Sequence, residues 1–520
     1  MAENQRQQFR FSEAPIWDLQ RNYYEEEGMK AWNNDQVPQY ISSNPMMATS
    51  YAEMIFGFLQ DRAGTGDLSE PVTIMELGAG AGRLAFHTLH RLCELRDYAG
   101  IELPPFRYVM TDLASKNVLA WQHHPALQPF IREGLLDFAR FDAVRDTEVH
   151  LAVAQTTIRP GDLKQPLIIV ANYFFDVIPQ ELIYVHDGEV YECDISVEFP
   201  DNLKELTTSE TLKQMKLNYV NRPAPEYREK TYPYHDLIDM YVSELDDSYI
   251  LFPVAGLTCL DRLHRLSRAG FLLITADKGD HRLEHWDLAD PPEFFHHGSF
   301  SLTANYHAIQ HVLEQRGGLS LFTKEHHYHA INVGCILMLE SPMRYANTRL
   351  AFRRFVDRFG PDEFFSLKEW VDQHSGSMGL QQILAFWRLG GYDAEFFIQS
   401  TKRISALLPE AGEEELLDIQ NGIHIMWSSF YVMEQRYDLA LDAGLLLFEM
   451  EFYDDAKEFL SLSIETDEDE SVPTVLFCLA ICSYEQGDKE AAMTYLRDAL
   501  VLEPEHEDAL ALLHALTAEE

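Results

Sequence analysis

Short apolar runs and longer amphipathic stretches alternate along the middle of the chain. Between residues 71 and 345, runs rich in Val, Ile and Leu, typical of buried strands, are separated by stretches with a helical period. The runs are Val72–Leu77, Arg107–Thr111, Leu167–Ala171, Gly270–Thr275 and Ile331–Leu339. Strands separated by helices predict a doubly wound, Rossmann-like α/β sheet in this part of the chain.

The flanking regions have different patterns. Residues 1–70 are polar and aromatic and lead into an apolar helix that we expect over residues 50–60. Residues 346–410 have a helical pattern without a clear repeat, and residues 411–520 are helical throughout. We therefore expect four parts, which are an N-terminal helical and aromatic segment (1–70), an α/β domain (71–345), a helical connector (346–410) and a domain of helical repeats (411–520).

The last part contains an internal repeat of the tetratricopeptide type. This repeat places small residues where two antiparallel helices cross closely, a glycine in the turn and a proline after the second helix. The matching positions are Leu476, Leu479, Ala480, Gly487, Ala492, Leu496, Ala499 and Pro504, with an upstream copy at Gly444, Ala456, Leu460 and Ser463. Such repeats form a concave surface, so we expect this domain to bind a peptide or a partner protein.

A glycine-rich motif follows the first apolar run. The run ends near Glu76, and Gly78, Ala79, Gly80 and Gly82 lead into a helical stretch. Glycines let the backbone turn tightly and approach a ligand closely, and the free N–H groups of the helix start face that ligand. The order GxGxG after an acidic strand end resembles class I S-adenosylmethionine (SAM) methyltransferases. The resemblance implies that the loop lies along the methionine and ribose of SAM, and that Glu76 reaches its charged amino group directly or through water.

Acidic residues follow the next two strands in the same way. Asp112 and Leu113 follow the second apolar run, where a doubly wound fold offers a carboxylate to ribose hydroxyls. Asp142 and Ala143 stand where the adenine edge is held in such folds, although a solvated loop aspartate is the alternative for Asp142.

The apolar run over residues 167–171 ends in polar residues that would meet the methyl acceptor. Ligands of doubly wound sheets lie outside the carboxyl ends of the strands. Asn172 would orient an acceptor by hydrogen bonds, and Asp176 would act as a base or an anchor or, alternatively, cap a following helix. Methyl transfer depends mainly on close contact between acceptor and methyl group. An acceptor that must lose a proton also needs a base, for which Asp176, Tyr173 and His307 are the candidates.

Three segments resemble one methyltransferase family. The segment Ala171–Pro179 resembles the signature A-(N/H)-E-F-F-D-(A/V)-L-P of the MidA-like methyltransferases, which include the mitochondrial complex I assembly arginine methyltransferase. Ile274–Gly279 is similar to the family's I-D-Y-G strand end, and Gly298–His307 to its G-x-x-D-(I/V)-T-A-(H/N)-V-D segment. The resemblance covers about residues 35–345 and does not include the repeats. It implies the fold, SAM as cofactor and a protein side chain, arginine in the named member, as methyl acceptor.

Three acidic positions of that family differ in this sequence. They are occupied by Tyr173, Ser301 and His307, whereas Asn172 and Asp176 are kept. A guanidinium acceptor needs carboxylates that orient it and offset its charge, so these replacements argue against arginine as the acceptor.

The overall charge restricts the class of partner. The chain has 84 Asp and Glu against 41 Lys and Arg, a formal net charge of −43, which disfavours nucleic acids and anionic membranes as partners. Residues 411–520 alone hold 27 acidic and four basic side chains. A protein bound by the repeats is therefore expected to be basic.

Cysteines, histidines and the N-terminus indicate a cytoplasmic protein without a metal site. The six cysteines are scattered and include no CxxC pair, which suits a reducing cytosol, and Cys478 and Cys482 are expected to be packed thiols. The histidine-rich stretches lack a metal-ligand spacing. We find neither a signal or transit peptide nor the roughly 18 apolar residues that a membrane span needs.

These patterns predict a SAM-dependent methyltransferase that acts on a protein side chain. The aromatic residues Trp17, Tyr23, Tyr24 and Trp32 would form a lid over the acceptor pocket or pack onto the core. Two alternatives stay open. One is a non-catalytic SAM-binding assembly or regulatory factor, and the other is a small-molecule O- or N-methyltransferase whose repeats make a homo-oligomer.

Overall fold

The computed structural model describes residues 7–33, 40–65, 68–433, 437–464 and 472–518. The chain divides into two compact units, Met1–Leu367 and Lys368–Glu520. The division falls inside helix α13 (Pro361–His374), so residues 346–367 of the expected connector belong to the first unit.

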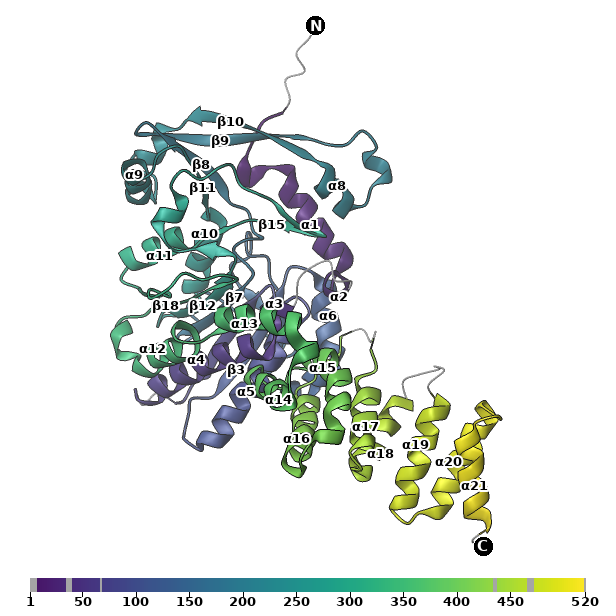
Figure 1. Ribbon diagram of the computed structural model, residues 1–520. Coiled ribbons are helices and arrows are strands. Elements are labelled where there is room, and N and C mark those ends of the chain that lie inside the picture. The colour runs from purple at the N-terminus through teal and green to yellow at the C-terminus, as the bar shows by residue number, and fades with distance from the viewer. Residues whose placement is uncertain (1–6, 34–39, 66–67, 434–436, 465–471, 519–520) are drawn as a thin grey trace. The chain divides into compact units, whose positions relative to one another are not determined.

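The first unit is built on a seven-stranded sheet with the order β17-β18-β12-β7-β2-β3-β4 (Figure 1). Its strands are β2 (Val72–Leu77), β3 (Phe106–Asp112), β4 (Leu136–Arg140), β7 (Leu167–Asn172), β12 (Phe271–Asp277), β17 (Leu319–Leu321) and β18 (Asn332–Met338). The five strands from β12 to β4 pair in parallel, and β18 is antiparallel to both of its neighbours. The five predicted strands are present, and the predicted doubly wound α/β fold is confirmed.

Helices cover the sheet. Every residue of β2 and of β12 is buried, which requires packed elements on both faces. Helix α4 (Pro45–Ala63) packs against α5 (Arg83–Ala99) and α12 (Ala346–Phe352). Asn44 begins α4, because its side chain accepts the N–H of Met47 at 2.9 Å and Pro45 occupies the first helical position. The helices predicted over residues 50–60 and 84–95 lie within α4 and α5.

The apolar pattern did not predict a second sheet, of which four strands lie between β7 and β12 in the sequence and one, β1, lies near the N-terminus. Its five antiparallel strands are β1 (Phe9–Arg10), β8 (Glu181–His186), β9 (Glu189–Glu198), β10 (Lys216–Pro223) and β11 (Ser248–Phe252). Half-buried and exposed residues alternate along β10, and tyrosine and charged residues are frequent in β9. β9 and β10 have no continuous apolar run, so the criterion that found the main sheet missed them.

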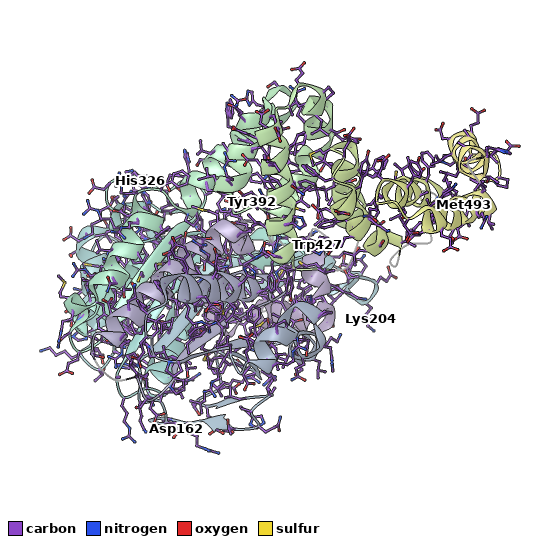
Figure 2. The ribbon with its side chains drawn as sticks, turned by 90° about the horizontal axis from the view of Figure 1, so that it is seen from below. Asp162, Lys204, His326, Tyr392, Trp427 and Met493 are labelled. Atoms are coloured by element: carbon purple, nitrogen blue, oxygen red, sulfur yellow. The ribbon has the colours of Figure 1, made fainter. Side chains whose placement is uncertain are left out.

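The second unit is helical. After α13 its helices are α14 (Leu380–Leu389), α15 (Ala394–Leu407), α16 (Glu413–Ser428), α17 (Leu439–Glu449), α18 (Tyr453–Ile464), α19 (Val472–Glu485), α20 (Lys489–Leu502) and α21 (Glu507–Ala518). Trp427 packs edge-on against Phe459 with 5.1 Å between ring centroids, and Met493 is buried in α20 (Figure 2). The predicted all-helical C-terminal region is confirmed.

Two contacts fit the predicted repeat. A Cβ at Gly444 in α17 would lie 2.8 Å from the side chain of Leu460 in α18, so these helices cross closely at a glycine. Gly487, with a φ of 79°, lies in the turn between α19 and α20. The tetratricopeptide type itself stays a prediction.

Two simpler expectations can be compared with the structure. Cys478 and Cys482 are buried in α19, as expected for packed thiols. Among the helices of the described residues, none combines the length and hydropathy that crossing a membrane requires.

Candidate functional site

The glycine-rich loop connects β2 to α5 in a conformation that favours glycine. Gly78, Gly80 and Gly82 have φ values of 64°, 55° and 85°, which L side chains rarely adopt. A Cβ at Gly80 would lie 2.8 Å from the indole ring of Trp32. The sequence therefore uses glycine here both for the backbone turn and for a close approach.

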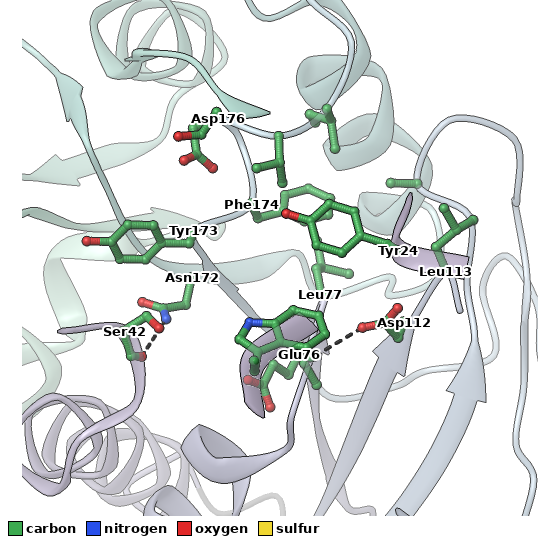
Figure 3. A pocket seen from close by; sticks show the side chains of 18 of the residues that line it. Tyr24, Ser42, Glu76, Leu77, Asp112, Leu113, Asn172, Tyr173, Phe174 and Asp176 are labelled. Atoms are coloured by element: carbon green, nitrogen blue, oxygen red, sulfur yellow. Dashed lines mark hydrogen bonds between the residues drawn. The ribbon is translucent and has the colours of Figure 1, made fainter. Parts of the chain in front are cut away.

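A cavity of about 570 Å³ lies along this loop and the carboxyl ends of β2, β3 and β7, a size typical of small-ligand sites (Figure 3). All the predicted cofactor-binding residues line it, namely Glu76, Gly78, Ala79, Gly80, Gly82, Asp112, Leu113, Asp142 and Ala143. Three predicted catalytic residues line it too, namely Asn172, Tyr173 and Asp176.

Glu76 is buried near the end of β2. Its Oε2 accepts a hydrogen bond from the hydroxyl of Tyr108 at 2.9 Å. Burial raises the pKa of Glu76 to about 8, because it penalises the charged carboxylate; the bond from Tyr108 opposes this rise and the charge of Asp112 adds to it. A cation bound beside Glu76 would favour the charged form again, so the side chain is suited to a ligand's ammonium group.

Asp112 fixes the glycine loop from the end of β3. Its Oδ2 accepts the N–H of Gly80 at 3.0 Å, and its Oδ1 accepts the N–H of Ala114 at 2.8 Å. Burial raises the pKa of Asp112, although these hydrogen bonds lower it. Each oxygen has a second lone pair, so the carboxylate can hold the loop and still accept hydrogen bonds from a ligand's hydroxyls.

Asp142 is paired with the N-terminal segment. Arg21 in α1 (Pro15–Glu27) donates from Nη2 to Oδ2 at 2.6 Å and from Nη1 to Oδ1 at 3.3 Å. Burial tends to raise the pKa of Asp142, but the hydrogen bonds from Arg21 and from the N–H of Val144 hold it below its usual value. Asp142 is 2% exposed, so the alternative of a solvated loop residue is wrong.

Asn172 is held in one orientation at the end of β7. Its Oδ1 accepts the hydroxyl of Tyr51 at 3.0 Å, and its Nδ2 donates to the backbone oxygen of Ser42 at 2.7 Å. Tyr173 has a φ of 50°, which turns the chain at this point. Burial raises the pKa of the Tyr173 phenol, so it stays protonated near neutral pH.

Asp176 and Asp277 form a buried carboxyl pair. Asp277 ends β12, and its Oδ2 accepts the N–H groups of Phe175 at 3.1 Å and of Asp176 at 3.2 Å. Burial raises the pKa of both side chains, and the charge of Asp176 raises that of Asp277 further. The two carboxyl groups interact directly, so they titrate as a pair and not as independent groups. The alternative that Asp176 caps a helix is wrong, because β7 is followed by a turn and then by β8.

Lys278 brings a positive charge to the same end of the cavity. It follows Asp277 directly, lines the cavity, and places Nζ 3.0 Å from the ring centroid of Phe295. Burial lowers the pKa of Lys278, while the charges of Glu293 and Asp176 raise it.

His307 does not line the cavity and is not placed to act as its base. The side chain of Asn305 accepts the N–H of Ala308 and so begins α11 (Tyr306–Gln315), which carries His307. There the Nδ1 of His307 lies 3.0 Å from the hydroxyl of Tyr241. Burial lowers the pKa of His307 to about 4, so it is neutral at neutral pH.

The N-terminal aromatic residues pack against other residues, as expected for the second alternative, and three of the four also line the cavity, whereas the lid stays a prediction. Trp17 is 4% exposed and packs against Phe300, with 5.4 Å between ring centroids, as a core residue does. Tyr24 and Trp32 stack on each other at 5.8 Å. Trp17, Tyr24 and Trp32 also line the cavity, so packing and pocket lining coincide in these three residues.

Sequence reasoning missed the roles of Arg21, Tyr51, Asp277 and Lys278. Arg21 and Tyr51 each bond to a residue 121 positions away, a separation for which the sequence contains no local signal. Asp277 and Lys278 had a signal, because they directly follow a buried strand, as Asn172 does. The rule that ligands lie outside the carboxyl ends of such strands applies equally to β12.

Two groups of side chains have the composition of a metal site. His186 with Asp187 and Asp246, and His326 with Asp362 and Glu363, each bring potential ligand atoms within 4.8 Å of one another. In the second group both oxygens of Asp362 already accept backbone N–H groups of residues 329–331. Neither group lines the cavity.

Comparison with known proteins gives structural likenesses at low identity. No protein-family model and no curated protein matches this chain. An uncharacterized protein from Burkholderia thailandensis is 16% identical, with a TM-score of 0.37. The match covers 61% of this chain and 74% of that chain. A member of the same superfamily from that organism, bound to S-adenosyl-homocysteine, is 17% identical, with a TM-score of 0.40 and the same coverage. The magnesium protoporphyrin IX methyltransferase of Synechocystis with bound SAM is 11% identical, with a TM-score of 0.28. That match covers 62% of this chain and 96% of the methyltransferase.

Proposed function

We propose that the chain is a SAM-dependent methyltransferase. One observation carries the proposal: the glycine loop, Glu76 and Asp112 line the same cavity, at the carboxyl ends of β2 and β3. The sheet order, with the antiparallel strand β18 between β12 and β17, is also that of class I methyltransferases. The residues present fit the cofactor, because the three glycines with positive φ place no side chain of their own in the cavity, and the indole of Trp32 lies against Gly80 there.

The cofactor-binding residues divide the cavity into three regions. Glu76 would hold the ammonium group of SAM, Asp112 its ribose hydroxyls, and Ala143 the adenine edge. Asp142 would act there mainly through its backbone, because Arg21 already pairs with its carboxylate. When bound, SAM supplies a methyl group on a sulfonium, which is attacked by a nucleophile held in line with the breaking bond.

The end of the cavity near the carboxyl end of β7 contains groups that would orient a methyl acceptor and remove a proton from it. Tyr51 and Ser42 hold the amide of Asn172 in place, so Asn172 orients an acceptor without having to become ordered first. The carboxyl pair of Asp176 and Asp277 would take up a proton from an acceptor that loses one. Tyr173 lines this end as a hydrogen-bond donor, because its phenol stays protonated.

We further propose a protein as the acceptor. The helical second unit supports this, because helical repeats of the tetratricopeptide type bind peptides and partner proteins. Its acidity favours a basic partner whose affinity falls as the salt concentration rises. We also propose a cytoplasmic location, which is supported by six scattered cysteines without a CxxC pair.

Calorimetry with SAM and a glycine variant would test the cofactor assignment. Gly80→Ala is expected to abolish measurable SAM binding, because its Cβ would lie on the cavity side of the loop at a strained φ. Gly134→Ala is the matched control. Gly134 has a φ of 72°, and a Cβ there would meet nothing within 4 Å, so it adds backbone strain without touching the cavity. Unchanged affinity in Gly80→Ala would contradict the assignment.

Transfer of tritium from labelled SAM would test the catalytic function. The chain is incubated with a cell lysate, and label is counted separately in the protein and small-molecule fractions. Label in protein is the expected result, and label in small molecules only would replace the protein acceptor by a metabolite. SAM binding without any transfer would favour the non-catalytic SAM-binding factor, which the replacement of three family carboxylates suggests.

A further inference from the structure

The indole ring of Trp32 covers the middle glycine of the loop. A Cβ built on Gly80 would lie 2.8, 3.0 and 3.3 Å from Cζ2, Cε2 and Cη2 of Trp32. These three atoms are bonded neighbours, and an approach in the plane of the ring would bring one of them clearly nearer than the other two. The nearly equal distances therefore mean that Gly80 points at the face of the six-membered ring, which lies in direct contact with the loop.

Tyr24 stacks on the same indole. The two ring centroids are 5.8 Å apart, and the ring planes differ by 25°. Trp32 belongs to α2 (Lys30–Asn33) and Tyr24 to α1, so the N-terminal part of the chain places two aromatic rings over the glycine loop. Both residues line the cavity together with Glu76 and Asp112 (Figure 3). The stacked pair therefore takes up space inside the proposed cofactor site.

The glycine loop is fixed by hydrogen bonds, whereas packing holds the indole. The N–H of Gly80 donates to Asp112 at 3.0 Å, and its carbonyl oxygen accepts the Nε1–H of Trp121 at 3.1 Å. Among the described residues, none forms a hydrogen bond with the side chain of Trp32. Moving the indole would therefore leave the loop in place and break no polar contact of its side chain.

The indole and a bound cofactor would compete for the same contact. A glycine at position 80 allows a ligand to approach the backbone closely, and the face of Trp32 already occupies this approach. Two groups cannot lie against Gly80 at once, so a ligand that does so must first displace the indole. When only a fraction of the molecules is open, the apparent affinity of the ligand is reduced by that fraction.

We propose that Trp32 is an internal plug of the cofactor site, which SAM must displace to reach the glycine loop. The inference rests on the proposed methyltransferase function and names a regulation of the same site. Trp32 then opposes cofactor binding, whereas Glu76 and Asp112 support it.

Calorimetry with S-adenosyl-homocysteine would test the plug. Trp32→Ala is expected to bind it at least about fivefold more tightly than the unaltered protein, which corresponds to an open fraction of at most about one fifth. Trp370→Ala is the matched control and should bind as the unaltered protein does, because Trp370 is 54% exposed and does not line the cavity. Equal or weaker binding by Trp32→Ala would overturn the proposal, since an indole that stays beside the cofactor would add affinity.

Fluorine NMR of the protein labelled with fluorotryptophan tests the displacement directly, even if Trp32→Ala does not fold. The chain has seven tryptophans, and the signal that is missing from Trp32→Phe belongs to Trp32. The shift difference of a signal between H₂O and D₂O reports the exposure of the ring to solvent. Saturation with S-adenosyl-homocysteine should raise this difference for Trp32 toward that of Trp370. An unchanged difference would overturn the displacement.

The same titrations separate the plug from the proposed function. If neither the unaltered protein nor Trp32→Ala binds S-adenosyl-homocysteine, the proposed function fails. If both bind it with the same affinity, only the plug fails. Binding by Trp32→Ala alone would support both.

Discussion

At the scale of single residues, the proposed cofactor site contains two buried acids, Glu76 and Asp112, whose pKa values are raised by burial. Burial raises the pKa of Glu76 to about 8 and that of Asp112 above its usual value. A group of this kind opposes folding at high pH. The folded state is most stable below the pKa that the group has in the unfolded chain, and this stability is lost as the pH rises through the higher pKa of the folded state. A ligand's ammonium group would remove this cost by pairing with the carboxylate.

SAM binding is therefore expected to release a proton from Glu76 at neutral pH. The ammonium group lowers the pKa of Glu76 in the complex, so affinity should rise as the pH increases toward about 8 and level off above it. Calorimetry in buffers with different ionisation enthalpies measures the number of protons released. Glu76→Gln should bind more weakly, roughly tenfold or more, and should lose most of the proton release. Equal proton release in Glu76→Gln would assign the proton to another group, with Asp112 as the next candidate.

The site could be predicted from the sequence where a residue's role follows from its place at a strand end. Glu76, Asp112 and Asn172 each end or nearly end a buried strand, and all three line the cavity. His307 was expected there only because it matches a family position, and the cap at Asn305 begins a helix that carries it away. The pairing of Arg21 with Asp142 depends on the tertiary fold, which a linear pattern does not encode.

At the scale of elements, few polar contacts hold α1, whose residues line part of the cavity. Arg21 pairs with Asp142, and Gln20 donates from Nε2 to the backbone oxygen of Phe300 at 2.8 Å. Trp17 adds apolar packing against Phe300. The side chain of Asp142 is 3% exposed, so removing Arg21 would leave a buried carboxylate with only the exposed Arg145, 3.9 Å away, as a countercharge.

Arg21→Ala is expected to loosen α1 more than the rest of the first unit. Hydrogen exchange of the α1 amides should become faster, and thermal stability should fall by several degrees, because a buried charge that loses its hydrogen-bonded partner is costly. Asp142→Asn in addition to Arg21→Ala should recover part of this loss, since it removes the buried charge. Arg96→Ala is a suitable control, because its partner Asp97 is 68% exposed and such pairs contribute little. Unchanged exchange in α1 would show that apolar packing alone holds the helix.

The prediction of elements succeeded for continuous apolar runs and failed for strands with charged residues. The main-sheet strands β2, β7 and β12 consist mostly of apolar residues, since helices cover both faces of the sheet, whereas β4 of the same sheet contains Asp137 and Arg140 and was not predicted. The strands β8, β9 and β10 carry charged and tyrosine residues, among them Glu192, which bonds to Tyr227 at 2.8 Å. Such strands depend on cross-strand polar pairs, and a criterion of hydrophobic runs does not detect them.

At the scale of the whole molecule, the acidity belongs mostly to the helical unit. Residues 411–520 hold 27 acidic and four basic side chains, whereas the net charge of the whole chain is −43. All the residues that line the proposed site lie within the first unit, as do all strands of both sheets. The proposed cofactor chemistry and the proposed partner binding are therefore carried by different parts of the sequence.

A chain that ends after His374 should fold and bind SAM with an affinity within about twofold of that of the full protein. Ending there keeps α13 whole, including its buried Phe364 and Val371, whereas ending at Leu367 would cut the helix. The measurements are calorimetry with SAM and thermal unfolding of both proteins. Because none of the described residues of the helical unit lines the cavity, its removal takes away no cofactor contact seen in the structure. A soluble, folded 1–374 fragment that no longer binds SAM would contradict the independence of the two units.

The same fragment should lose the salt-sensitive binding of a basic partner, because the acidic residues 411–520 are absent from it.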